Sequence, residues 1–173
     1  MHPATARPRA RVCLIMLSLL LLGLTGPAWP RDDAESRASL KGIPGIRVVV
    51  EGFTTDVELA GLTKDQLQTA VEARLRQAGI KVTSSAAETE GFLYLNVNTF
   101  KDSSGLLYPY NIRLEFNQPV IVVRNRNVSL LAPTWSVAKI GIMGADWLRD
   151  VRDEVADLVD RFIIAYLDQN PKP

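Results

Sequence analysis

The stretch "GFLYLNVNTFKDSSGLLYPYNIRLEFN", residues 91–117, decides the predicted fold. Both of its ends alternate apolar side chains with polar or larger ones, which is the period of two of a half-buried β-strand. The residues predicted to face inward are Leu93, Leu95, Val97, Ile112, Leu114 and Phe116. Between the two ends, "KDSSGLLYP" is rich in turn-forming residues, as expected of a hairpin connection. We therefore expect an antiparallel hairpin here.

Three further segments have strand-like patterns: "IRVVVEGF" (46–53), "IKVTS" (80–84) and "TWSVAKIGI" (134–142). After the second hairpin strand, "VIVVR" (120–124) continues the strand beyond Pro119. Proline cannot donate a ladder hydrogen bond, so Pro119 indicates an edge or a bulge. The sequence thus predicts about five strands.

Two amphipathic helices complete the pattern. In the first, Thr63 is the expected N-cap with Gln66 in a capping box, and Gly79 is the expected left-handed residue of a Schellman ending. The closing helix is expected over residues 145–169, with Asp146 as its N-cap. Its apolar stripe comprises Leu148, Val151, Val155, Leu158, Phe162 and Tyr166. The acidic residues Asp153, Glu154 and Asp157 are expected on its solvated side.

The order strand–helix–strand–strand–strand–strand–helix predicts an α+β fold. We expect a two-layer sandwich in which both amphipathic helices pack on one face of a mixed, mostly antiparallel sheet.

Residues 1–28 have the features of a secretory signal peptide. Three arginines precede the apolar run "CLIMLSLLLLGL" (13–24), and the small residues of "TGPA" follow it. The alternative is an uncleaved anchor, although a spanning helix needs about 20 apolar residues. Residues 29–41 are predicted to be a flexible tether and residues 42–173 a single domain. The expected destination is the periplasm, without a lipid anchor, because Cys13 lies inside the apolar run.

Composition excludes several function classes. Removing residues 1–28 leaves 17 basic residues against 19 acidic ones, which gives no electrostatic footprint for nucleic acid. The sole histidine, His2, and the sole cysteine, Cys13, are removed with the signal. The mature chain therefore has neither a Ser–His nor a Cys–His nucleophile and no His/Cys zinc site. We expect no cofactor, no metal and no enzyme activity.

Two apparent motifs have simpler explanations. Ser136 and Lys139 spell S-x-x-K, but on a strand residues three apart point to opposite faces. Gly141 and Gly144 precede a helix start that already carries carboxylates, so a phosphate would be repelled and a flexible turn is favoured. The sequon "NVS" places Asn127 on a surface turn.

The candidate partner-binding residues are Phe92, Tyr94, Phe100, Leu106, Tyr108 and Tyr110. Phe92, Tyr94 and Phe100 are predicted on the sheet face away from the helices, and the other three at or beside the hairpin tip. Aromatic side chains with polar ends are favoured at binding surfaces. One alternative is that Leu107 and Tyr108 pack inward. The other is that the sheet face away from the helices is partly uncovered, as is normal for an antiparallel sheet in a monomer.

The blocks "GLTKDQLQTAVEARLRQAGIKV", "LYLNVNTFKD", "YNIRLEFNQPV" and "LRDVRDEVADLVDRFIIAYLDQNP" together resemble an uncharacterised family of small exported bacterial proteins. The resemblance implies an envelope protein and brings no catalytic residues. The element order is also similar to that of the amino-terminal domain of TolB and of the lipoprotein LptE, which is fold-level analogy. The expected function is an adaptor or assembly factor that binds another envelope component. The alternative is a carrier of a small apolar or lipid-like ligand held between helices and sheet.

Overall fold

The computed structural model describes residues 31–51, 53, 58, 61–85, 88–89, 91–144 and 147–171, with Leu148 described for its backbone only. The predicted signal peptide (1–28) and the predicted N-cap Asp146 lie outside these residues.

The described strands form one open sheet in the order β1-β2-β3-β4. Its strands are β1 (Arg47–Val50), β2 (Phe92–Thr99), β3 (Tyr108–Ile121) and β4 (Ser129–Met143). β1 pairs with β2 in parallel, whereas β2–β3 and β3–β4 are antiparallel. The α+β class and the hairpin over residues 91–117 are therefore confirmed.

The predicted strand at residues 80–84 is not one of the four. Only Val82 takes part in β structure, through an isolated parallel bridge to Ile46. Directly after this bridge the chain turns, because the Thr83 side chain accepts a hydrogen bond from the Ser85 amide (3.2 Å) and donates one to Glu88 (3.1 Å). The local polar contacts end the pairing after one residue.

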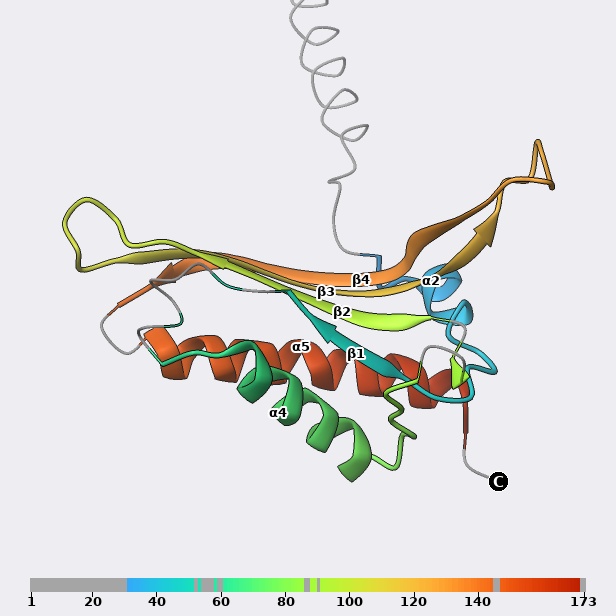
Figure 1. Ribbon diagram of the computed structural model, residues 1–173, viewed down its shortest axis with the longest axis horizontal. Coiled ribbons are helices and arrows are strands. Elements are labelled where there is room, and N and C mark those ends of the chain that lie inside the picture. Colours follow the sequence, from blue (N-terminus) through green and yellow to red (C-terminus); the bar gives the residue numbers. More distant parts are fainter. Residues whose placement is uncertain are drawn as a thin grey trace, which may run out of the picture.

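Two long helices, α4 (Lys64–Gln77) and α5 (Trp147–Gln169), lie on the same side of the sheet (Figure 1). Alternate side chains of all four strands meet them in one core. Its largest fully buried members include Trp135, Phe116, Phe162, Leu75, Leu93 and Leu114. The predicted stripe of α5 is buried from Val151 to Tyr166, which confirms that this helix packs through that face.

Local signals set the ends of α4. Thr63 accepts a hydrogen bond from the Gln66 amide at 3.3 Å, as predicted, but the Gln66 side chain accepts one from Arg152 of α5. At the other end, the Ile80 amide donates to the Leu75 carbonyl and the Gly79 amide to the Arg76 carbonyl. Gly79 has φ +78°, so the predicted Schellman ending is confirmed.

The prediction of a flexible tether is wrong for residues 31–41. Asp33 caps the short helix α2 (Ala34–Ala38), and Leu40 is fully buried. The Asp32 carboxylate accepts hydrogen bonds from Arg37 (2.7 Å), Trp135 (2.9 Å) and Arg161 (3.1 Å). The Asp32 contacts thus hold this polar segment against the domain.

Beyond the core, β3 and β4 continue as a two-stranded ribbon. Asn117 is the last residue of β3 that pairs with β2. The β3–β4 register shifts between Phe116 and Asn117, where Thr134 is an extra residue on β4. We call residues 118–133 the arm; it rises from the end of the sheet, away from α4 and α5 (Figure 1). Pro119 lies in this ribbon, where β3 has no β2 neighbour and one edge is free, as its lack of an amide hydrogen predicted. It pairs with Leu131, and the bulge precedes it, at the step from Phe116 to Asn117.

Candidate interaction surface

The sheet face away from α4 and α5 is not covered by any described element. Alternation along β2 places Phe92, Tyr94, Asn96 and Asn98 on this face, and β3 adds Asn111, Arg113 and Glu115. We call it the bare face. The predicted positions of Phe92, Tyr94 and Phe100 on the side opposite the helices agree with this alternation.

A chain of hydrogen bonds organises the half of the bare face near β1. The Tyr94 hydroxyl donates to the Glu51 carboxylate at 2.6 Å, and the Asn96 amide donates to the same oxygen. Asn98 in turn donates to Asn96. The hydrogen bond to Glu51, together with burial, raises the pKa of Tyr94 to about 12. The polar side chains here are therefore held in one arrangement.

An aromatic pair lies beside this network. The Phe92 and Tyr94 rings meet edge to face with centroids 6.4 Å apart, and the Arg47 guanidinium stands 4.8 Å from the Phe92 ring centroid. Such contacts fix the rings without covering them. Phe92 and Tyr94 are only half-buried.

The opposite half of the bare face exposes several apolar side chains, with Asn98 and Asn111 beside them. Phe100, Pro109, Ile140 and Ile142 line one shallow hollow, which we call the apolar patch. Ile140 is 78% exposed, and Phe100 and Ile142 are also largely exposed. Sequence reasoning found Phe100 but missed the two isoleucines. The available signal was the alternation in "KIGIM", which puts Ile140 and Ile142 on the face opposite Lys139 and Gly141.

The three residues predicted around the hairpin tip separate in the structure. Leu106 is 72% exposed, in the turn whose amides bind the Asp102 carboxylate. Tyr108 stacks on Trp147 with centroids 5.0 Å apart, and Tyr110 is 8% exposed on the helix side. Tyr108 and Tyr110 therefore hold the start of α5 to the sheet. They do not join the bare face, because the alternation along β3 turns both side chains to the helix side.

The S-x-x-K pair is split as the strand geometry predicts. Ser136 exchanges hydrogen bonds with the Arg31 backbone at the outer edge of β4. Lys139 points to the helix side and forms an ion pair with Glu154. Glu154 also accepts a hydrogen bond from Tyr110 at 3.3 Å, so the prediction that this carboxylate lies on the solvated side of the helix is wrong.

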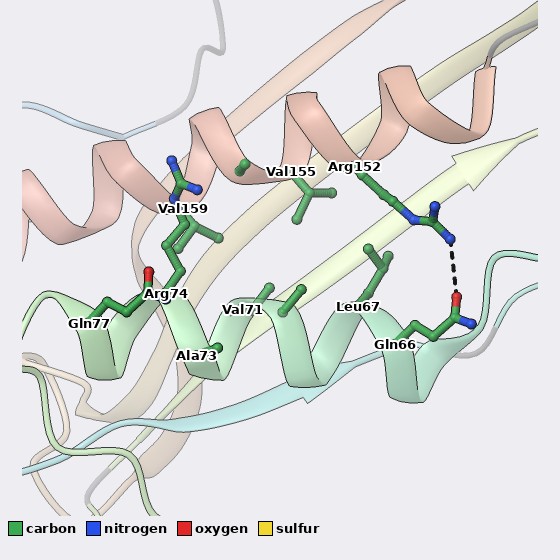
Figure 2. Close-up of a pocket in the computed structure, with 11 residues that line it drawn as sticks. Gln66, Leu67, Val71, Ala73, Arg74, Gln77, Arg152, Val155 and Val159 are labelled. Carbon is green, nitrogen blue, oxygen red and sulfur yellow. Dashed lines mark hydrogen bonds between the residues drawn. The ribbon is translucent and has the colours of Figure 1, made fainter.

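A groove of about 280 Å³ runs between α4 and α5 (Figure 2). Its apolar floor consists of Leu67, Val71, Val155 and Val159. Figure 2 shows Arg74 and Arg152 entering it from opposite ends. The Arg74 guanidinium donates one hydrogen bond to each carboxylate oxygen of Asp160, both at 2.5 Å. Arg152 instead donates to the neutral side chain of Gln66 at 3.2 Å.

Two further features concern ligands and membranes. Among the residues that the structure describes, no cluster of three His, Cys, Asp or Glu side chains could hold a metal ion. Within the same described ranges, no helix has the length and apolar character that a membrane crossing requires.

Comparison of the chain with protein-family models gives no match, and comparison with curated proteins gives none either. The resemblance to small exported bacterial proteins, TolB and LptE stays a prediction.

Proposed function

We propose that the chain is exported to the periplasm and acts there as a non-enzymatic adaptor or assembly factor. It binds another envelope protein across the bare face. The observation that carries this proposal is the apolar patch, where Phe100, Ile140 and Ile142 remain exposed beside a fixed polar network. Contiguous apolar surface rimmed by polar groups is typical of protein interfaces.

The outer edge of β4 is less suitable as the principal site. At its centre, the Ser136 amide donates to the Arg31 carbonyl at 3.0 Å, and the Arg31 amide donates to the Ser136 hydroxyl at 3.1 Å. A strand added by a partner would have to displace these bonds. The bare face needs no such displacement.

Site-specific photocrosslinking in the native envelope tests the proposal. A photoreactive amino acid replaces Ile140 in the apolar patch, and in a matched control it replaces Ile164, an isoleucine on α5 that is 55% exposed. We expect one discrete protein adduct from position 140 and none from position 164. Identification by mass spectrometry then names the partner.

A substitution in the same patch provides the second measurement. Ile140→Glu adds a charge to an interface that must lose water, so it should reduce the adduct formed from a photoreactive residue at Phe100 by about tenfold or more. The same adducts from positions 140 and 164, or an adduct that Ile140→Glu leaves unchanged, would contradict a site on the bare face.

The groove between α4 and α5 supports a second candidate, a carrier of an amphiphile with one acyl chain. This place differs from the predicted one, because the inward side chains of α4, α5 and the sheet are buried against one another in the core. The groove is slightly smaller than the roughly 300–1,000 Å³ of typical ligand pockets, and Arg152 is its cation without a carboxylate partner among the described residues.

A fluorescent fatty acid tests this candidate. Binding should be lost in Ala70→Trp, which fills the groove, and weakened in Arg152→Gln. The adaptor proposal predicts that neither substitution changes crosslinking from position 140, so the two functions have separate readouts.

A further inference from the structure

The arm is the most apolar exposed part of the described chain. Its exposed aliphatic side chains are Ile121, Val123, Val128, Leu130 and Leu131, and Val123 is 87% exposed. The register pairs Pro119 with Leu131 and Val120 with Leu130, so consecutive pairs present apolar groups on both faces of the ribbon. Neither face can be covered by α4 or α5, because the arm has left that layer (Figure 1).

The charge of the arm has one sign. Arg124 and Arg126 lie in the turn at its tip, and both are exposed. The sequence contains no Asp or Glu between Glu115 and Asp146. A surface that complements the tip must therefore be negatively charged.

The side chains favour lipid over protein as the occupant. Protein interfaces are enriched in Trp, Tyr, Phe, Met and Arg, and of this set the arm contains only the two arginines at its tip. Branched aliphatic residues with terminal arginines suit a bilayer surface instead. There the aliphatic groups enter the interface while the guanidinium groups stay with the phosphates.

Backbone hydrogen bonding limits how deeply the arm can enter a bilayer. Beyond Asn117, β3 has no further partner in β2, and the arm portion of β4 is the outer strand of the sheet. Free strand edges cannot enter hydrocarbon, because their amides and carbonyls would lose water without gaining partners. The arm can lie in the headgroup region and no deeper.

We propose that the arm docks the protein on an anionic lipid surface, with the tip arginines on lipid phosphates and the aliphatic side chains in the interface. At the base of the arm, Arg31 shares one hollow with Asp33 and Glu35, so the cationic character of the arm is concentrated at its tip. The proposal does not rest on the adaptor function. The apolar patch lies at the opposite end of β3 from the arm.

A probe on the arm tests the proposal in the full chain. Residues 13–24 are apolar and can bind bilayers by themselves, so attachment of the protein is not a sufficient readout. We would combine Cys13→Ser with Val123→Cys and attach an environment-sensitive fluorophore to the single cysteine. Vesicles of phosphatidylcholine mixed with phosphatidylglycerol should shift its emission to the blue, and vesicles of phosphatidylcholine alone should not.

Matched variants separate the arm from general charge. Each arginine near an anionic surface contributes about a fivefold factor in binding, so Arg124→Gln with Arg126→Gln should raise the lipid concentration at half-shift by at least tenfold. Lys41→Gln with Lys64→Gln removes the same charge from two exposed positions outside the arm and should change it by less than about threefold. Equal thermal unfolding midpoints establish that all variants are folded.

Three outcomes would overturn the proposal. The first is an unchanged emission with anionic vesicles, and the second is an equal shift with neutral ones. The third is a shift that grows with protein concentration when no vesicles are present, which would mean that a second copy covers the arm. Loss of crosslinking from position 140 would refute only the adaptor function.

Discussion

Glu154 illustrates at the scale of a residue how a tertiary contact reassigns a side chain. It belongs to a helix side that looks solvated in the sequence. In the fold its carboxylate reaches Lys139 on the outer strand and Tyr110 on the next strand. Burial, followed by the negative charge of Glu154, raises the pKa of Tyr110. The first turns of α5 are therefore fastened to the sheet by polar as well as apolar contacts.

Gly141→Ala should destabilise the fold at this point. A Cβ on residue 141 would meet the Tyr110 ring and hydroxyl at 2.7 Å, so Tyr110 must move and its contact with Glu154 is disturbed. We expect a loss of about 1–3 kcal/mol in the free energy of unfolding, measured by denaturant titration. Gly144→Ala is the control, because nothing lies within 4 Å of its added Cβ. Equal losses in both variants would contradict the steric explanation.

Asp32→Asn should loosen the amino-terminal segment from the domain. Burial raises the pKa of the Asp32 carboxyl, but the hydrogen bonds from Arg37, Trp135 and Arg161 outweigh burial, so the pKa is lowered from 3.8. Since hydrogen bonds to charged groups contribute more than neutral ones, the substitution should cost about 1–3 kcal/mol near neutral pH.

The same carboxylate gives a pH dependence of known sign. A lowered folded-state pKa means that the stabilisation is complete above the unfolded value of 3.8 and is lost as the pH falls through the lower folded value. The stability difference between wild type and Asp32→Asn should therefore narrow below about pH 4. A difference that is constant with pH would show that Asp32 acts through shape alone.

At the scale of elements, the parallel pair β1–β2 is joined by side chains as well as by its ladder. Glu51 follows the last residue of β1 and receives hydrogen bonds from Tyr94 and Asn96 of β2. Of the side chains in this hydrogen-bond network, Glu51 and Tyr94 are the two that can titrate. The state of their contact can be followed through the tyrosine.

Glu51→Gln should lower the pKa of Tyr94 from about 12 towards its ordinary 10.0, because the hydrogen-bonded carboxylate is the principal cause of the shift. The measurement is a spectrophotometric tyrosine titration, with Tyr94→Phe identifying the signal and circular dichroism reporting the folded state. The raised pKa contributes stability that is present below pH 10 and is lost as the pH rises through about 12. An unchanged tyrosine titration in Glu51→Gln would exclude this bond.

On the scale of the whole molecule, stability is distributed unevenly between a two-layer body and a single-layer arm. The body has α4 and α5 over the sheet, whereas the arm is a ribbon of two strands. A ribbon of two strands is marginally stable by itself. Its conformation depends on the bulge at Thr134 and on contacts at its base, such as the hydrogen bond from Gln118 to the Ser39 carbonyl at 3.1 Å.

Hydrogen exchange should show this division. The amides of residues 120–130 should exchange at least about a hundredfold faster than those of residues 112–116, because opening the arm exposes no buried core. The measurement is exchange followed by mass spectrometry on peptides that cover β3 and the arm. Equal protection of both segments in dilute solution would mean that another chain covers the arm.

By itself the sequence determined the features that depend on near neighbours. These are the caps of α4 at Thr63 and Gly79, the alternation of β2 and β3, the stripe of α5 and the outward position of Phe92, Tyr94 and Phe100. Each follows from backbone geometry and the spacing of apolar side chains within one element, so a window of a few residues contains the whole cause.

Only the tertiary structure decided the features that join distant segments. Trp135 and Arg161 hold the polar segment around Asp32, although it reads as a tether. The strand expected at residues 80–84 is reduced to a bridge at Val82. Ile140, Ile121 and Leu131 look like core residues in the sequence, yet they are exposed because neither helix covers their side of the sheet or their end of it. Whether an apolar side chain is buried depends on what packs over it, and that is a property of the assembled layers.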